Sequence, residues 1–233
     1  MQMVSEAVQV QTQGLLFDMD GVLISSIGSV ERCWKRWAKL YQIPDAEDFQ
    51  VPHGVRAVDI VRLLKPEFSE VEVAEGLRVI EDMEIEDTAD LKVLRGAKAL
   101  LSSLPEERWA IVTSATRRLA VARLRAAGLP IPERLISGDM VERGKPDPEP
   151  YRRGAELLGL SPADCVVIED APSGVGAGLA AGSRVLAVLS THRAEELQHA
   201  TWIVRSLEQI RAGMSNGGLE LEANSHASTR ETQ

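Results

Sequence analysis

Short apolar runs alternate with amphipathic segments along most of the chain. The runs that have the length and aliphatic character of buried strands are residues 14–17, 109–112, 135–136, 165–168, 185–188 and 202–204. Segments with helical spacing lie between or after them, at residues 96–104, 117–127, 150–158, 175–181 and 207–212. Aliphatic strands separated by helices predict a parallel sheet covered on both faces, which is an α/β, Rossmann-like core.

The stretch between the first two strands has a different pattern. Its apolar side chains recur at helical spacing and predict helices at residues 27–41, 55–64 and 70–86. Trp34 and Trp37 lie three residues apart in the first helix, and we expect them to pack against their neighbours. Because no strand pattern interrupts this stretch, we expect an all-helical domain at residues 25–92. It is inserted into a core formed by residues 1–24 and 93–214.

The two ends of the chain carry little apolar patterning. The first thirteen residues are mostly polar, and no element is predicted for them. Residues 215–233 are polar and rich in Ser, Asn, Gly and Thr. Such a composition does not bury enough apolar surface to fold, so we expect this tail to be disordered.

Composition excludes several classes of protein. The formal charge of −9 argues against nucleic acid or an anionic membrane as a partner, because both need clustered Lys and Arg. Cys33 and Cys165 are the only cysteines, too few for a disulfide framework or a zinc site. No apolar run reaches the length of a membrane span, and the N-terminus lacks the features of a secretory signal. We therefore expect a cytoplasmic protein, and we expect a monomer.

Polar side chains follow three of the predicted strands at the point where each strand ends. Asp18 follows the first strand, Ser114 lies just beyond the second, and Glu169 and Asp170 follow the strand at 165–168. Ligands of parallel sheets bind outside the carboxyl ends of the strands. We therefore expect these four side chains to meet in one site.

Their chemistry suits the transfer of a phosphoryl group, in which positioning and positive charge dominate. Of Asp18 and Asp20, one carboxylate could attack phosphorus and the other could handle protons. Both are anionic and would repel a phosphate unless a cation is present. Mg²⁺ binds a few carboxylates together with phosphate oxygens, and Glu169 and Asp170 offer further oxygen ligands. Lys145 adds a fixed positive charge.

The sequence resembles the haloacid dehalogenase superfamily of phosphohydrolases. Four motifs stand in the family's order and carry this resemblance over residues 14–205: Asp18-Met19-Asp20-Gly21-Val22, Thr113-Ser114, Gly144-Lys145-Pro146, and Val167-Ile168-Glu169-Asp170-Ala171-Pro172-Ser173-Gly174. Each motif alone is a weak or moderate indicator, but four in order are highly specific.

The resemblance implies a role for each matched position. Asp18 would be the nucleophile and would form an aspartyl-phosphate, and Asp20 would be the acid and base. The Asp18 carboxylate, the Asp20 carbonyl and Asp170 would hold Mg²⁺, with Glu169 binding it directly or through water. Ser114 and Lys145 would hold the phosphoryl oxygens, together with backbone donors near Ala115.

Within the superfamily the chain is similar to phosphatases of glycerol phosphate, 2-deoxyglucose 6-phosphate and other small sugar phosphates. The residues that carry this likeness are Pro52-His53-Gly54-Val55-Arg56, Thr113-Ser114-Ala115-Thr116-Arg117 and Gly144-Lys145-Pro146-Asp147-Pro148-Glu149-Pro150-Tyr151. In such enzymes a helical cap follows the first motif and screens substrates. The resemblance therefore implies that His53, Arg56, Ala115 and Thr116 bind substrate, and that the partner is a small phosphorylated metabolite.

Two alternatives stay open. A β-phosphoglucomutase shares all four motifs but carries a cap histidine where this chain has Val30, which favours hydrolysis. A dinucleotide-binding oxidoreductase would use the Gly-x-Gly-x-x-Ala pattern that Gly174-Val175-Gly176-Ala177-Gly178 forms together with Ala181. Residues 169–173 separate these glycines from the strand end, which disfavours that function.

Overall fold

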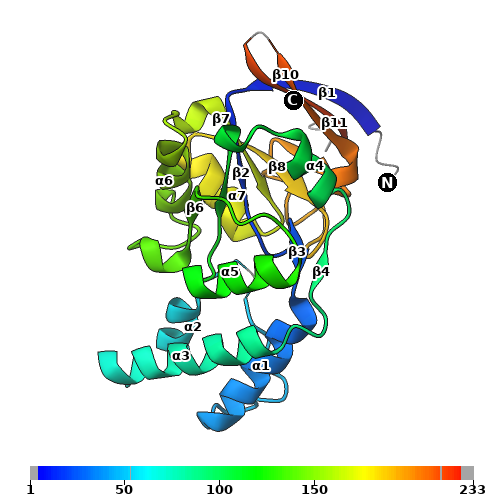
Figure 1. Cartoon of the computed structure of the whole chain (residues 1–233). Helices are drawn as coiled ribbons and strands as arrows, with labels where there is room; N and C mark the ends of the chain where they lie inside the picture. Colours follow the sequence, from blue (N-terminus) through cyan, green and yellow to red (C-terminus); the bar gives the residue numbers. More distant parts are fainter. Residues whose placement is uncertain (1–4, 53, 216, 227–233) are drawn as a thin grey trace, which may run out of the picture.

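A parallel sheet forms the centre of the chain (Figure 1). The structure is a computed structural model that describes residues 5–52, 54–215 and 217–226. The strand order is β6-β5-β2-β7-β8-β9, and every neighbouring pair in it is parallel. The strands are β2 Gly14–Phe17, β5 Trp109–Val112, β6 Leu135–Ile136, β7 Cys165–Glu169, β8 Arg184–Val188 and β9 Trp202–Val204. The prediction of an α/β core is confirmed.

Helices cover both faces of this sheet. On one face lie α4 Ala97–Ser103 and α5 Arg117–Ala126, and on the other lie α6 Glu149–Leu157 and α7 Pro172–Ala181. Successive residues of a strand point to opposite faces, so Phe17 packs in one apolar cluster with Leu124, and Leu16 packs in the other with Tyr151. This burial on both faces explains why the strands are aliphatic throughout.

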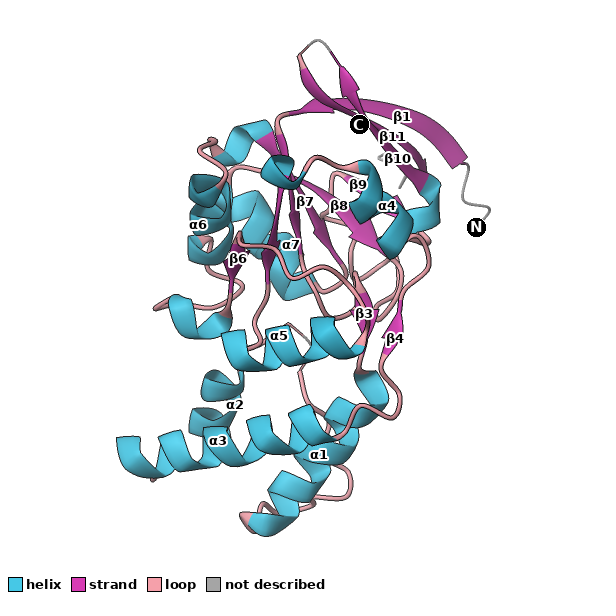
Figure 2. Cartoon of the chain, in the orientation of Figure 1, coloured by secondary structure: helices cyan, strands magenta, loops and turns pink. Residues whose placement is uncertain are grey.

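The inserted domain, called the cap below, contains three helices with an apolar cluster of their own. They are α1 Ile27–Leu40, α2 Ala57–Leu64 and α3 Glu70–Glu86. Trp37, Ile60 and Ile80 are buried among them, and Trp37 contacts Trp34 as expected. Two short strands, β3 Ile24–Ser25 and β4 Lys92–Val93, pair antiparallel where the chain enters and leaves the cap (Figure 2). The sequence predicted the helices but not this pair of strands.

The prediction of a disordered C-terminal tail is wrong for residues 218–226. These residues form β11 Gly218–His226, which lies between β1 Ser5–Thr12 and β10 Ile210–Ser215 in an antiparallel sheet. The predicted helix at 207–212 is also wrong, because a single 3₁₀ turn, Leu207–Gln209, leads into β10. Leu219 and Leu221 are fully buried in the core, and they alternate with Glu220 and Glu222. This alternation is typical of a strand, but the prediction of disorder was based on the polar composition of the tail. Residues 227–233 lie outside the described chain.

Several smaller features complete the fold. Further 3₁₀ turns are Glu106–Arg108, Gly138–Met140 and Pro162–Asp164. Cys33 and Cys165 are buried free thiols. In the described part of the chain, no helix combines the length and the apolar character that crossing a membrane would need.

Candidate active site

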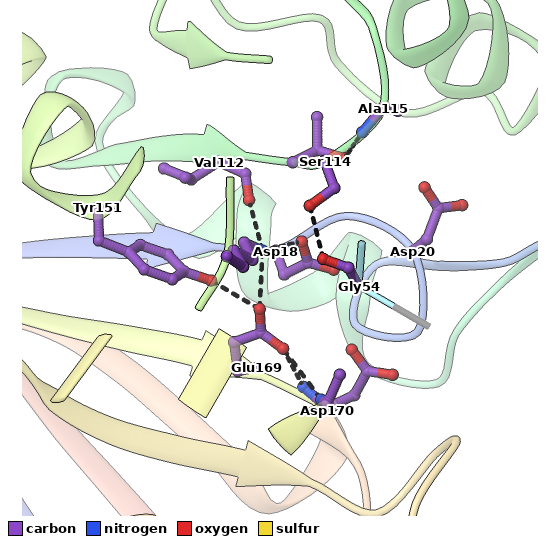
Figure 3. A network of polar contacts seen from close by, with 12 residues as sticks. Asp18, Asp20, Gly54, Val112, Ser114, Ala115, Tyr151, Glu169 and Asp170 are labelled. Carbon is purple, nitrogen blue, oxygen red and sulfur yellow. Dashed lines mark hydrogen bonds and ion pairs between the residues drawn. The ribbon is translucent and has the colours of Figure 1, made fainter. Parts of the chain in front are cut away.

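The polar residues expected at the strand ends do meet, at the edge of the sheet that faces the cap. Asp18 follows β2, Ser114 lies just beyond β5, Glu169 ends β7, and Asp170 follows it. Figure 3 shows these side chains converging from neighbouring strands. β2 pairs with both β5 and β7, so the parallel register brings the three strand ends together. This is the position at which an open α/β sheet binds its ligand.

Lys145 joins two of these carboxylates. Its Nζ donates to Asp18 Oδ1 at 2.5 Å, to Glu169 Oε1 at 2.7 Å and to the carbonyl of Val112 at 3.2 Å. These three acceptors use all the donors of an ammonium group. Burial alone would lower the pKa of Lys145, but the charges of Asp18 and Glu169 raise it, so the side chain stays cationic. A fixed positive charge therefore lies beside Asp18.

Glu169 is the residue that holds this lysine. Its Oε1 also accepts a hydrogen bond from the Tyr151 hydroxyl at 2.8 Å, and its Oε2 accepts from the backbone N–H groups of Asp170 and Ala171 at 2.8 and 3.0 Å. Burial alone would raise the pKa of Glu169, but Lys145 and these donors lower it. With both oxygens engaged, Glu169 is built to position Lys145. Tyr151 ends one of the motifs that carry the resemblance, but no role was predicted for it. The packing of α6 against β5 and β2 brings it to the site.

Three buried carboxylates form a group suited to a metal ion. Asp18, Glu169 and Asp170 each offer an oxygen within 4.8 Å of the others. Burial raises the pKa of Asp18 to about 7, with Lys145 opposing and Glu169 reinforcing the shift. Burial and the charges of Glu169 and Asp18 raise the pKa of Asp170 well above its usual range. One ammonium does not balance three carboxylates, and a hard divalent cation with oxygen ligands would do so.

The loop after Asp18 brings Asp20 to the same place. Gly21 has a φ of +87°, and a Cβ at this position would collide with the carboxylate of Asp170. Only glycine lets the loop that contains Asp20 approach Asp170 so closely. The buried carboxylates of Asp18 and Asp170 therefore fit two of the Mg²⁺ ligands that the resemblance implied. The third, the Asp20 carbonyl, stays a prediction.

The Asp20 carboxylate is held by two donors outside the lysine cluster. Ser26 Oγ donates to Oδ1 at 2.6 Å, and Arg123 Nη1 donates to Oδ2 at 2.9 Å. Arg123 lies on α5 and is 5% exposed. No role was predicted for Arg123, although it lies at helical spacing from the buried Leu119 and Ala120, where a charged residue is rarely found without a partner. A charged residue on the buried face of the predicted helix was therefore the sequence signal that could have identified Arg123.

The residues after β5 connect the core to the cap. The Ser114 hydroxyl donates to the carbonyl of Gly54 at 2.7 Å. Thr116 caps α5 by accepting from the N–H of Leu119 at 3.2 Å, and its hydroxyl donates to Glu81 of the cap. Thr116 is thus the N-cap of α5. Ser114, Ala115 and Thr116 all line the cavity between cap and core.

Arg56 is placed differently from the expected substrate contact. It pairs with Asp59 at 2.8 Å and donates to the carbonyl of Val141 at 2.9 Å. Its side chain occupies space next to Gly144, where a Cβ would lie 2.6 Å from Arg56 Nε. Arg56 is absent from the described residues that line the cavity, so the structure assigns it to the contact between cap and core. His53 lies outside the described residues.

The cavity itself lies between the strand ends and the cap. Its lining includes Asp18, Asp20 and Arg123 from the core, and Trp34, Glu81 and Glu84 from the cap. Glu81 is occupied by Thr116 and by Arg118, whose Nη1 donates to it at 2.6 Å. Burial raises the pKa of Glu84 to about 7, although Arg123 opposes the shift. A substrate bound at Asp18 would extend into this acidic chamber.

The glycines of the dinucleotide-like pattern serve packing. They lie inside α7, which begins at Pro172, whereas the nucleotide fingerprint needs them in the turn before the helix. A Cβ on Gly174 would collide with the Glu169 carboxylate, and one on Gly178 would lie 2.8 Å from Val185. These glycines let α7 approach the sheet and the site closely, so the pattern does not indicate a dinucleotide site.

Comparison with known proteins agrees with this geometry. Hexitol phosphatase A of Escherichia coli is 42% identical over 200 residues, which are 85% of this chain and 93% of that protein. Glycerol-1-phosphate phosphohydrolase 2 of Saccharomyces cerevisiae is 31% identical over 237 residues, covering 93% of this chain and 91% of the relative. A structure of β-phosphoglucomutase from Clostridium difficile has the same fold, with a TM-score of 0.73 at 20% identity, and the match covers 86% of this chain and 94% of that one.

The family model of haloacid dehalogenase-like hydrolases matches residues 12–182. That range contains all four motifs, the whole cap and the cluster of Lys145 with its carboxylates. The chain is therefore a member of the haloacid dehalogenase-like hydrolase family.

Proposed function

We propose that this protein is a Mg²⁺-dependent phosphatase that hydrolyses small sugar or polyol phosphates through Asp18. The observation that carries the proposal is the buried group in which Lys145 lies between Asp18 and Glu169, with Asp170 beside them. The named activities of the two relatives, on hexitol phosphates and on glycerol 1-phosphate, support the substrate class. The cytoplasmic location and the monomeric state stay predictions.

The proposed reaction has two steps. An Asp18 carboxylate oxygen attacks phosphorus, the P–O bond to the leaving group breaks, and Asp20 gives its proton to the leaving oxygen. In the second step Asp20 takes a proton from water, which attacks phosphorus and releases phosphate from Asp18. Lys145, with the N–H groups of the loop after β5, faces the phosphoryl oxygens. Mg²⁺, held by Asp18, Asp170 and the Asp20 carbonyl, would neutralise charge on the phosphoryl group.

A mutase is the second candidate, because the chain shares its fold with a β-phosphoglucomutase. Such an enzyme needs a cap residue that transfers protons or that binds a second phosphate group on the sugar. The cap position at issue is Val30, which lines the cavity and carries no acid, base or charge. This apolar position favours hydrolysis.

Phosphate release from a panel of esters tests the proposal. With Mg²⁺ we expect turnover of hexitol phosphates and of glycerol phosphate, and the rate should fall at least about a hundredfold when EDTA removes the metal. Adding Mg²⁺ back should restore it. A parallel assay for conversion of β-glucose 1-phosphate to the 6-phosphate separates the two candidates. Isomerisation without phosphate release, or hydrolysis that EDTA leaves unchanged, would contradict the proposal.

A further inference from the structure

One guanidinium nitrogen of Arg123 is buried without a hydrogen-bond partner in the described part of the chain. Nη1 is bound to Asp20, but Nη2 is buried and has no hydrogen-bond partner among the residues that the structure describes. It lies 3.5 Å from Glu84 Oε1, close enough for charge attraction without a directed bond. An unsatisfied buried donor costs free energy and calls for an explanation. Arg123 lines the cavity, so an acceptor on the substrate would satisfy it.

Glu84 supplies the complementary acceptor. It lies on α3 of the cap, its side chain is 7% exposed, and it lines the same cavity. Trp34 and Arg123 both interact with its carboxylate, but neither saturates two oxygens with four lone-pair sites. A buried donor from the core and a buried acceptor from the cap therefore stand side by side.

A hydroxyl group matches this pair of side chains. Its oxygen accepts a hydrogen bond from Arg123 Nη2, and its O–H donates to Glu84. A second anionic group fits poorly, because the charged residues that line the described cavity are Asp18, Asp20, Glu81, Glu84 and only one base, Arg123. That base is already paired with Asp20. An apolar group would leave both Arg123 and Glu84 unsatisfied.

We propose that Glu84 and Arg123 form a recognition site for a substrate hydroxyl on a carbon adjacent to the phosphorylated carbon. The position follows from Arg123, which binds the proton donor Asp20 through one nitrogen and offers the other to the hydroxyl. The recognised hydroxyl thus lies next to the leaving oxygen. This inference rests on the proposed phosphatase activity and names the feature of the leaving group that it selects, a neutral vicinal hydroxyl.

The unmodified enzyme provides the first test. We expect kcat/KM for glycerol 1-phosphate to exceed that for n-propyl phosphate, which lacks the hydroxyls, by roughly 10- to 100-fold, the range for hydrogen bonds to charged groups. A third ester, 3-hydroxypropyl phosphate, keeps a hydroxyl but not on the adjacent carbon, and should behave like propyl phosphate. Equal kcat/KM values for glycerol 1-phosphate and either analogue would overturn the inference. No hydrolysis of any ester would instead contradict the phosphatase activity itself.

Two variants of α3 provide the second test. Glu84→Met keeps the length of the side chain but removes the acceptor, so the preference for glycerol 1-phosphate over propyl phosphate should fall to within about threefold of unity. Glu86→Gln makes a similar change on the exposed side of the same helix and should keep the full preference. A preference that survives Glu84→Met contradicts the site. If that variant does not fold, the three-ester comparison on the unmodified enzyme decides.

Discussion

Asp18→Asn should lower kcat for phosphate release by roughly 10⁴-fold or more, as the loss of a catalytic nucleophile does in other enzymes. The amide keeps the shape of the side chain and its contact with Lys145, but it is not a nucleophile. The burial that raises the pKa of Asp18 also means that the carboxylate is held at a cost in free energy. The neutral amide should therefore fold at least as stably, and a melting curve recorded beside the kinetic assay checks this.

Asp164→Asn is the matched control for this variant. Asp164 is exposed, and it precedes β7 at the end of the sheet opposite the site. The same chemical change there should leave kcat within about twofold. Undiminished turnover in Asp18→Asn would exclude Asp18 as the nucleophile, whereas a lost melting transition would mean that the variant reports on folding and not on chemistry.

Lys145→Met should have the second largest effect, on both activity and stability. The side chain is almost fully buried and pairs with Asp18 and Glu169 at 2.5 and 2.7 Å. Removing it leaves the buried carboxylates of Asp18 and Glu169 without a cationic partner, which costs about 3 to 5 kcal/mol of the free energy of unfolding. It also removes the fixed charge that faces the phosphoryl oxygens, so we expect kcat/KM to fall by roughly 10³-fold.

Denaturant unfolding and steady-state kinetics measure both effects of Lys145→Met. Lys98→Met is the control, because Lys98 is exposed on α4 and should tolerate the change within about 0.5 kcal/mol. Mg²⁺ should partly restore the stability of Lys145→Met, since a cation would again balance the carboxylates. A variant as stable and as active as the unmodified protein would show that the Lys145 cluster is not the centre of the site.

The parallel core was predictable from sequence because burial on both faces imposes aliphatic runs. The strand at 109–112 was placed correctly for this reason. β11 was missed because its outward residues are polar, so composition hid the alternation of Leu219 and Leu221. The pairing of β3 with β4 was missed because two-residue strands are too short to show a pattern.

The residues of the site also fall into those that the sequence predicted and those that it did not. Asp18, Glu169 and Asp170 were predictable because the backbone arrangement of a parallel sheet brings its strand ends together, independently of how side chains pack. The roles of Arg123 and Tyr151 were not predicted, because these residues reach the site from helices whose rotation about their axes depends on packing. The direction of Arg56 depended on two glycines of the core, Gly138 and Gly144, which leave room for its side chain. No local pattern records such a fit between distant segments.

Trapping the acyl phosphate tests most directly whether Asp18 receives the phosphoryl group. The enzyme is mixed with Mg²⁺ and excess glycerol 1-phosphate, quenched within the first turnovers and reduced with borodeuteride, which converts an aspartyl-phosphate to a deuterated homoserine. Peptide mass spectrometry should find this product at position 18 when substrate is present, and not when it is omitted. An unmodified Asp18 in an enzyme that is turning over substrate, or label at Asp20 or Asp170 instead, would contradict the nucleophilic role of Asp18.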